Sequence, residues 1–146
     1  MLIEAVISQL KDGVPDLGGR VEGIADWTKI SATRQLPQRT PAAYVLPLGK
    51  SGGQVHAITG LFRQAAITSI GILLIARAQD DKGARGLSRL SALLATIEGA
   101  ILGWQPEGEA DCFELGRSEL LASQDGALIY QFDFSISQQL RVSHGP

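Results

Sequence analysis

The side chains best able to do chemistry are scattered along this chain, and their spacing fits no catalytic motif. The run Gly49-Lys50-Ser51 resembles the end of a phosphate-binding loop, in which backbone N–H groups and a lysine hold phosphate ahead of a helix. The first glycine of that motif would fall at Tyr44, and no helical pattern follows Ser51. We therefore interpret the run as part of a surface loop without a nucleotide.

Two histidines and one cysteine are the remaining candidates for acid-base or nucleophilic catalysis. His56 lies in a glycine-rich segment, His144 lies far from it near the end of the chain, and no serine or cysteine stands in a nucleophile elbow. Cys112 stands beside Phe113 at a predicted strand start, where a buried apolar role is the commoner one. A single cysteine excludes an intrachain disulfide. We expect no catalytic residue here.

Four carboxylates are the only candidates for a cation site. They are Asp80, Asp81, Glu107 and Glu109. Carboxylates bind hard cations, but predicted turns ordinarily carry solvated Asp and Glu. The histidines and the cysteine also lack metal-ligand spacing. The sequence thus predicts a protein that is not an enzyme and has neither metal nor cofactor.

Composition indicates one globular domain. The 146 residues are 45% hydrophobic and 19% charged, which is enough to build a core. Thirteen Lys and Arg against fifteen Asp and Glu give a formal charge of −2, which disfavours a nucleic-acid-binding protein. The first ten residues contain Glu4 and no basic region, so we expect no signal peptide, and no apolar run predicts a membrane span.

In the first half of the chain, the elements that must position these residues are short. Apolar residues at helical spacing predict a helix over 2–10, and residues 20–25 favour a brief strand. Asp26 is a candidate N-cap for a helical turn that contains Trp27. An extended connection over 31–41 should lead into a strand over 42–48, whose Pro47 suits a strand end or sheet edge. Four glycines make residues 49–60 a loop or hairpin arm, which we expect to be flexible.

The second half has longer patterns. Residues 62–77 predict a strand with its middle buried on both faces. A long helix follows, with its apolar stripe at Leu87, Leu90, Leu94, Ile97 and Ile101. Gly103 suits the C-terminal cap, and Trp104 should be mostly buried against the long or the N-terminal helix. Two strands, over 111–121 and 127–141, form a hairpin around Asp125-Gly126. The fold class is α+β: a single domain, 1–146, with a mostly antiparallel or mixed sheet on which both helices pack.

Several segments, taken in order, resemble the tail terminator proteins of long-tailed bacteriophages, prophages and gene transfer particles, in the Mu-like branch. They are the N-terminal helix, "GRVEGIADW" at 19–27, "TPAAYVLPLG" at 40–49, Gln64 at the start of the long strand, "RAQDDKGARGLSRL", "ILGWQP" at 101–106 and the final hairpin. The resemblance covers nearly the whole chain, and each of its segments is structural.

The resemblance implies a structural virion protein at the head-proximal end of the tail, assembled in the bacterial cytoplasm. Copies of the chain would form a homo-hexameric ring that caps the tail tube, stops its polymerisation and joins it to the head-completion or connector proteins. Double-stranded DNA would pass through the channel without specific binding. Two alternatives stay open: a head-tail connector or minor tail protein, and a small ligand-binding or catalytic α/β domain that uses His56.

A ring of this kind needs exposed contact surfaces, and four parts of the sequence are candidates. The first is the polar side of the last strand, and the second is the arginine-containing connection before residue 42. The third is the glycine-rich arm, and a basic strip on the long helix could also face a neighbouring subunit. The predicted interface residues are Arg34, Arg39, Lys50, Val55, Ile58, Arg85, Arg89, Gln131 and Asp133.

Overall fold

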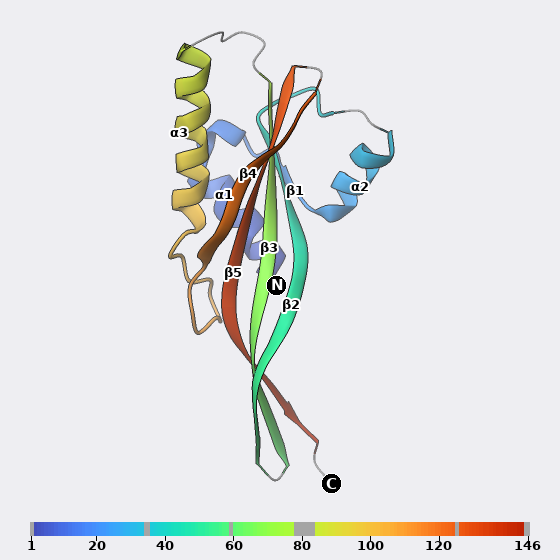
Figure 1. Ribbon diagram of the computed structural model, residues 1–146, viewed down its shortest axis with the longest axis vertical. Helices are drawn as coiled ribbons and strands as arrows, with labels where there is room; N and C mark the ends of the chain where they lie inside the picture. Colours follow the sequence, from blue (N-terminus) through green and yellow to red (C-terminus); the bar gives the residue numbers. More distant parts are fainter. Residues whose placement is uncertain (1, 34–35, 59, 78–83, 125, 145–146) are drawn as a thin grey trace.

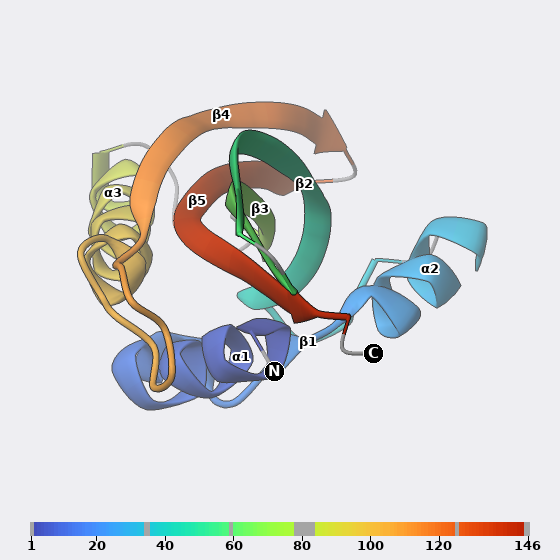
Figure 2. The same ribbon diagram turned by 90° about the horizontal axis from the view of Figure 1, so that it is seen from below.

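A curled five-stranded sheet forms the centre of the protein in a computed structural model of the chain (Figure 1). The structure describes residues 2–33, 36–58, 60–77, 84–124 and 126–144. Within these residues the strand order is β1-β2-β3-β5-β4, and every pairing is antiparallel except that of β1 with β2. Helices α1 and α3 lie together on one side of the sheet, and α2 lies apart from them (Figure 2). The predicted α+β class with a mixed sheet is confirmed.

Helices α1 (Leu2–Gly13) and α3 (Ala84–Ile101) cover the first face of the sheet. Their apolar stripes pack on the strands because residues three and four apart lie on one side of a helix. Burial of each aliphatic side chain contributes about 1.5–3 kcal/mol to the free energy of folding. Most of the buried apolar residues lie on this face, so it supplies most of the core. The helix residues buried there are Val6, Leu10, Leu93, Ile97 and Ile101. A short 3₁₀ helix, η1 (Pro15–Leu17), follows α1.

Strand β3 (Leu61–Arg77) is the central strand, and its middle is buried on both faces, as its apolar run predicts. Ile72 and Leu74 join the core under α1 and α3. Leu73 and Ile75 point to the second face and join a separate cluster. Alternation of side chains along a strand produces this division.

Helix α2 (Ile24–Thr33) covers one end of the second face. Three sequence predictions are wrong here. The strand over 20–25 is only β1 (Val21–Glu22), and the helix begins two residues later, so Asp26 lies in its first turn and is not the N-cap. The helix also continues to residue 33, where we predicted an extended connection. The indole of Trp27 packs on the buried ring of Tyr44 at 5.5 Å between centroids, and that tertiary contact favours helix over strand.

Strand β2 (Ala42–Ile58) is far longer than the predicted 42–48. Of the two alternatives predicted for residues 49–60, a loop or a hairpin arm, the structure shows the hairpin arm, because residues 49–58 pair with β3 as far as the Ile58–Leu61 register. Strand β1 pairs with β2 only at Ala43 and Tyr44, so beyond these residues β2 is a sheet edge. Pro47 lies on that edge, as predicted, where its missing N–H costs no ladder bond on the open side.

The far ends of three strands project beyond the helices (Figure 1). They belong to β2, β3 and β5 (Ala127–Ser143), and β3 lies between the other two. We call residues 49–58, 61–67 and 137–143 the arm. Every large apolar side chain described in the arm is at least partly solvent-accessible, so the arm has no core of large side chains of its own. The most exposed are Val55, Leu61, Phe62, Ile67 and Val142.

The C-terminal end of α3 is hydrogen-bonded to the loop that precedes β4 (Glu114–Gln124). Gly103 has φ +75° and donates its N–H to the Phe113 carbonyl at 2.8 Å, and Phe113 donates to the Trp104 carbonyl at 3.0 Å. The left-handed cap at Gly103 is therefore confirmed. Trp104 stacks on Phe113 at 5.9 Å and packs against the core of the first face, so its predicted burial is confirmed, although the indole is not fully buried. This tether also explains why β4 begins at residue 114 and not at 111.

Candidate assembly surface

The second face of the sheet is covered by α2 at one end only. At that end its cluster consists of Ala42, Tyr44, Leu73, Ile75 and Ala127, with Trp27 and Ile30 of α2 packed against it. Burial raises the pKa of the Tyr44 hydroxyl, and the negative charges of Glu22 and Asp26 raise it further. Beyond this cluster no described helix covers the sheet, and we call the uncovered part the open face. It includes Leu48, Ile67, Ser69, Arg117, Glu119, Gln131, Asp133 and Ser135.

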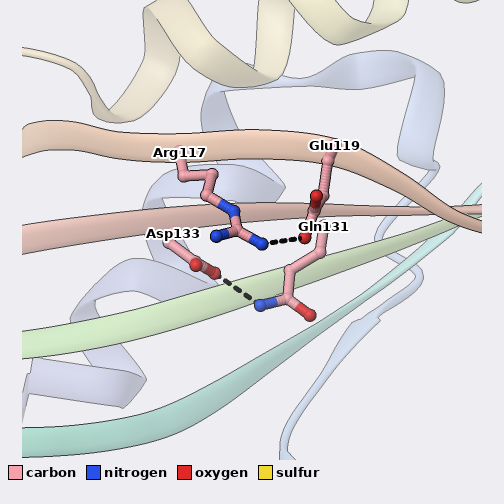
Figure 3. Close-up of polar contacts among 4 residues, drawn as sticks. All are labelled: Arg117, Glu119, Gln131 and Asp133. Carbon is pink, nitrogen blue, oxygen red and sulfur yellow. Dashed lines mark hydrogen bonds and ion pairs between the residues drawn. The ribbon is translucent and has the colours of Figure 1, made fainter.

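Four polar residues meet at the centre of the open face (Figure 3). In the β4–β5 register Arg117 lies opposite Asp133, and Glu119 lies opposite Gln131. The Arg117 guanidinium donates to Glu119 at 2.6 Å, and the Gln131 amide donates to Asp133 at 2.5 Å. Its hydrogen bond to Glu119 and that carboxylate's charge raise the pKa of Arg117 above its ordinary value.

This polar group adds little to the stability of the fold. Exposed ion pairs are screened by water and cost side-chain entropy, so their net contribution is small. Amide, carboxylate and guanidinium groups of this kind nevertheless suit the polar rim of a protein interface, where hydrogen bonds and bridging water molecules join the partners. The two predicted interface residues of the last strand, Gln131 and Asp133, do lie together on the open face. No pattern in the sequence indicated Arg117 and Glu119 as interface residues, because only the strand register brings them beside β5.

Apolar side chains border this polar group. Leu48 is 45% exposed and Ile67 is 50% exposed. Leu48 lies over Gly71, where a Cβ atom would come within 3.2 Å of the leucine side chain. A Cβ atom at position 71 would therefore require the Leu48 side chain to shift by a few tenths of an ångström. The open face thus combines apolar and polar groups, as the core and rim of an interface do.

The arm continues the open face and carries a row of cationic side chains. Arg63 of β3 lies opposite His56 of β2 and opposite Arg141 of β5, and all three side chains are exposed. Within the described part of the chain, no ion pair involves any of them. Like charges directly opposite each other on neighbouring strands are destabilising, so nothing in the described part of the chain accounts for the position of Arg63 opposite Arg141. We call these three residues the cationic row.

The other side of the arm is largely apolar. Phe62 lies opposite Val142 in the β3–β5 register, and Val55 lies one diagonal position away on β2. Their exposed fractions are 36%, 45% and 49% respectively. Lys50 points to the same side, because its register partner is Thr68. Thus two predicted interface residues, Lys50 and Val55, lie on one exposed surface.

Two of the other predicted interface residues have described side chains, and these lie apart from Lys50 and Val55. Arg39 is exposed in the connection before β2, and Arg89 lies on α3 on the opposite side of the sheet. Arg34 lies outside the described residues. The side chains of Ile58 and Arg85 lie outside them as well, although their backbones belong to β2 and α3.

A shallow groove of about 430 Å³ lies between the start of α1 and the loop that follows Trp104. Its walls combine apolar groups with three carboxylates. They include Leu2, Glu4 and Ala5 from the helix, and Pro106, Glu107 and Glu109 from the loop. The Gln138 amide donates to both Glu109 oxygens, at 3.0 and 3.1 Å, and holds the loop against the first face. We call this feature the acidic groove.

The described residues contain no arrangement that points to catalysis. Gly49, Lys50 and Ser51 lie within strand β2, so they do not precede a helix as a phosphate-binding loop must. Cys112 is half-buried, and His56 is exposed in the arm. Three or more His, Cys, Asp or Glu side chains do not gather into a possible metal site anywhere in the described chain. Asp80 and Asp81 lie outside it. None of the described helices is both long and apolar enough to cross a bilayer.

Comparison with known protein families shows which family the chain belongs to. Residues 1–144 match the family described as phage tail terminator protein. The chain belongs to the phage tail terminator family. The resemblance noted in the sequence is therefore confirmed, and the chain is a structural protein of phage-type tails, located in the virion.

A solved structure shows the same fold in a related particle. It is a chain from the structure titled "Virion of native gene transfer agent (GTA) particle", with a TM-score of 0.58 and 17% sequence identity. The alignment covers 95% of each chain. Among curated proteins none matches the sequence significantly. At this identity the structural match shows a common fold, and the family assignment rests on the sequence match.

Proposed function

We propose that copies of this tail terminator homologue assemble into a ring that caps the head-proximal end of a tail tube. The observation that carries the proposal is the family match over residues 1–144. The ring stops tube polymerisation and forms the joint to the head-completion or connector proteins. Six copies are expected from the resemblance to this family.

The uncovered surfaces of the subunit support an assembling protein. A ring closes through contacts between two different surfaces of each copy. The open face and the arm are exposed surfaces available for contacts, and they combine apolar side chains such as Leu48 and Ile67 with polar ones such as Gln131. In the ring, the apolar side of the arm lies on the tube, with Val55 as an apolar contact and Lys50 as a charged one.

The charge of the subunit is compatible with a channel for DNA. The formal charge of −2 gives six copies no net attraction for phosphates. Double-stranded DNA then passes through the ring without being held.

Polymerising tail tubes provide the test. Purified chain added to tube protein during polymerisation should shorten the tubes, and electron microscopy should show a ring at one end of each. Native mass measurement of the released caps should give six subunits. A stable dimer that leaves tube length unchanged would contradict the proposal.

The same experiment separates the terminator from a head-tail connector. A connector should form rings that bind the head vertex but leave tube growth unaffected. A variant without residues 53–64, closed by a two-residue turn, should retain the helix-covered fold and lose tube capping, because the deleted residues belong to the arm. If this variant still stops tube growth at the normal length, the arm is not needed as a contact with the tube.

A further inference from the structure

The charges of this chain are divided between the arm and the rest of the molecule. The arm contains three of the thirteen Lys and Arg residues, Lys50, Arg63 and Arg141, and none of the fifteen Asp and Glu residues. The remainder has ten basic against fifteen acidic residues, which is a formal charge of −5. Opposite charges therefore lie on different parts of one chain.

The strongest run of acidic residues borders the acidic groove. Residues 107–114 contain Glu107, Glu109, Asp111 and Glu114 and no basic residue. The groove adds Glu4 to them, together with the apolar Leu2 and Pro106. The cationic row of the arm has the matching composition, since exposed Leu61 lies on the same side of β3 as Arg63.

Within one chain these two surfaces cannot meet. Gln138 reaches the Glu109 carboxylate from the first face of the sheet, under which α1 and α3 pack. Arg141 is three residues further along β5, so alternation turns its side chain to the opposite face. The cationic row and the acidic groove of one copy therefore face away from each other, and only another copy can join them.

We propose that the cationic row of each subunit docks in the acidic groove of the next subunit. This inference rests on the proposed ring and names the contact that closes it. The contact is between two different surfaces, so it propagates from copy to copy as a ring requires, whereas a two-fold dimer would use one surface twice. Pairing with carboxylates also relieves the repulsion between Arg63 and Arg141 across the β3–β5 register.

A protein partner suits the cationic row better than nucleic acid does. Phosphate backbones are held by many basic side chains, and the row offers two arginines and one histidine. Leu61 beside them is 38% exposed and has no role against phosphates. A groove lined by both carboxylate and apolar groups satisfies both kinds of side chain.

Two charge-reversed variants test the contact. Arg63→Glu/Arg141→Glu makes the row acidic, and Glu4→Lys/Glu107→Lys makes the groove basic. Each variant alone should remain monomeric where the wild type forms rings, because like charges then meet at every contact. An equimolar mixture should form rings again, with the two variants alternating, and native mass should show three copies of each. If the wild type forms rings only on tube ends, the same comparison is made on isolated capped tubes.

Matched controls keep the outcomes distinct. Lys11→Glu reverses an exposed charge in the last turn of α1, outside both the cationic row and the lining of the acidic groove, and should leave ring formation intact, in contrast to Arg141→Glu. Circular dichroism and melting of each variant should match the wild type. Rings from both double variants alone, or no rings from their mixture, would overturn this contact. Loss of binding to duplex DNA by the arginine variant, without any effect of the groove variant, would identify DNA as the partner instead. A wild type that neither forms rings nor caps tubes would instead refute the proposed function.

Discussion

The two faces of the central sheet differ in what they contact, and this difference separates stability from assembly. On the first face, Phe132, Phe134 and Ile136 of β5 are buried under the helices. On the second face, the alternate residues Gln131 and Asp133 are polar and uncovered. One strand thus serves two purposes because its side chains alternate. Changes on the first face should unfold the subunit, whereas changes on the open face should leave a folded subunit that assembles poorly.

The largest effect is expected at Phe134, which is fully buried and stacks on Phe132 at 6.1 Å. Phe134→Ala should lower the free energy of unfolding by about 3–5 kcal/mol, because it removes a buried ring and leaves a cavity. Urea unfolding followed by circular dichroism measures this. Ser135→Ala, one residue away on the open face, is the control and should change stability by less than about 0.5 kcal/mol. Equal losses from the two variants would refute the division between the faces.

A smaller effect is expected at the exit of α3. Trp104→Ala should cost about 2 kcal/mol, below the ~3–5 kcal/mol of a fully buried ring, because part of the indole stays exposed to solvent. Phe113→Ala, which removes its fully buried stacking partner, should cost more. Thermal unfolding of both variants compares them. An unchanged melting temperature together with lost tail joining would make Trp104 a contact of the assembly instead.

The burial of Tyr44 at the covered end of the second face should make the stability of the protein depend on pH in the alkaline range. The folded state raises the pKa of Tyr44 above 10.0, so the unfolded chain loses this proton first as the pH rises. The stabilisation is full below the unfolded pKa and is lost as the pH passes through the folded pKa. Tyr44→Phe lacks this proton, so its urea midpoint should fall less between pH 9 and pH 11 than that of the wild type. If the urea midpoints of the variant and the wild type fall by the same amount, Tyr44 ionises equally in the folded and unfolded states.

The smallest effect on stability is expected at the centre of the open face. Arg117→Ala removes a guanidinium that is exposed and pairs only with Glu119 among the described residues, so the melting temperature should not change measurably. If the open face is part of the ring interface, the variant should still weaken ring formation in sedimentation experiments. Ser91→Ala, an exposed change on α3, should affect neither property. If Arg117→Ala forms rings as well as the wild type does, the polar group around Arg117 is not part of the ring interface.

Much of the fold follows from local patterns, and the errors are at places where distant contacts decide the structure. The helical stripe ending at Ile101, the cap at Gly103 and the alternation in β5 each depend on neighbouring residues. Residues 49–58 have the glycines of a loop, yet they form a strand because β3 extends an edge for them to pair with. Residues 24–26 favour a strand by composition, yet they form a helix whose Trp27 packs on Tyr44.

The candidate surface was predictable only in part. Gln131 and Asp133 follow from the period of two in the last strand, and the exposed arm residues Lys50 and Val55 follow from the glycines around them. The cationic row was not visible in the sequence, because Arg63 and Arg141 stand far apart in the chain. The same holds for Arg117 beside Asp133 and for the acidic groove.

By itself the sequence determined the fold class, the family and the buried face, because helix and strand periods and local caps are encoded over a few residues. Only the tertiary structure decided which exposed side chains gather into surfaces. Strand register places His56, Arg63 and Arg141 in one row, and the tether at Gly103 and Phe113 places the loop of Glu107 beside α1. Register is a long-range property fixed by the whole sheet, so no local pattern in the chain contains it.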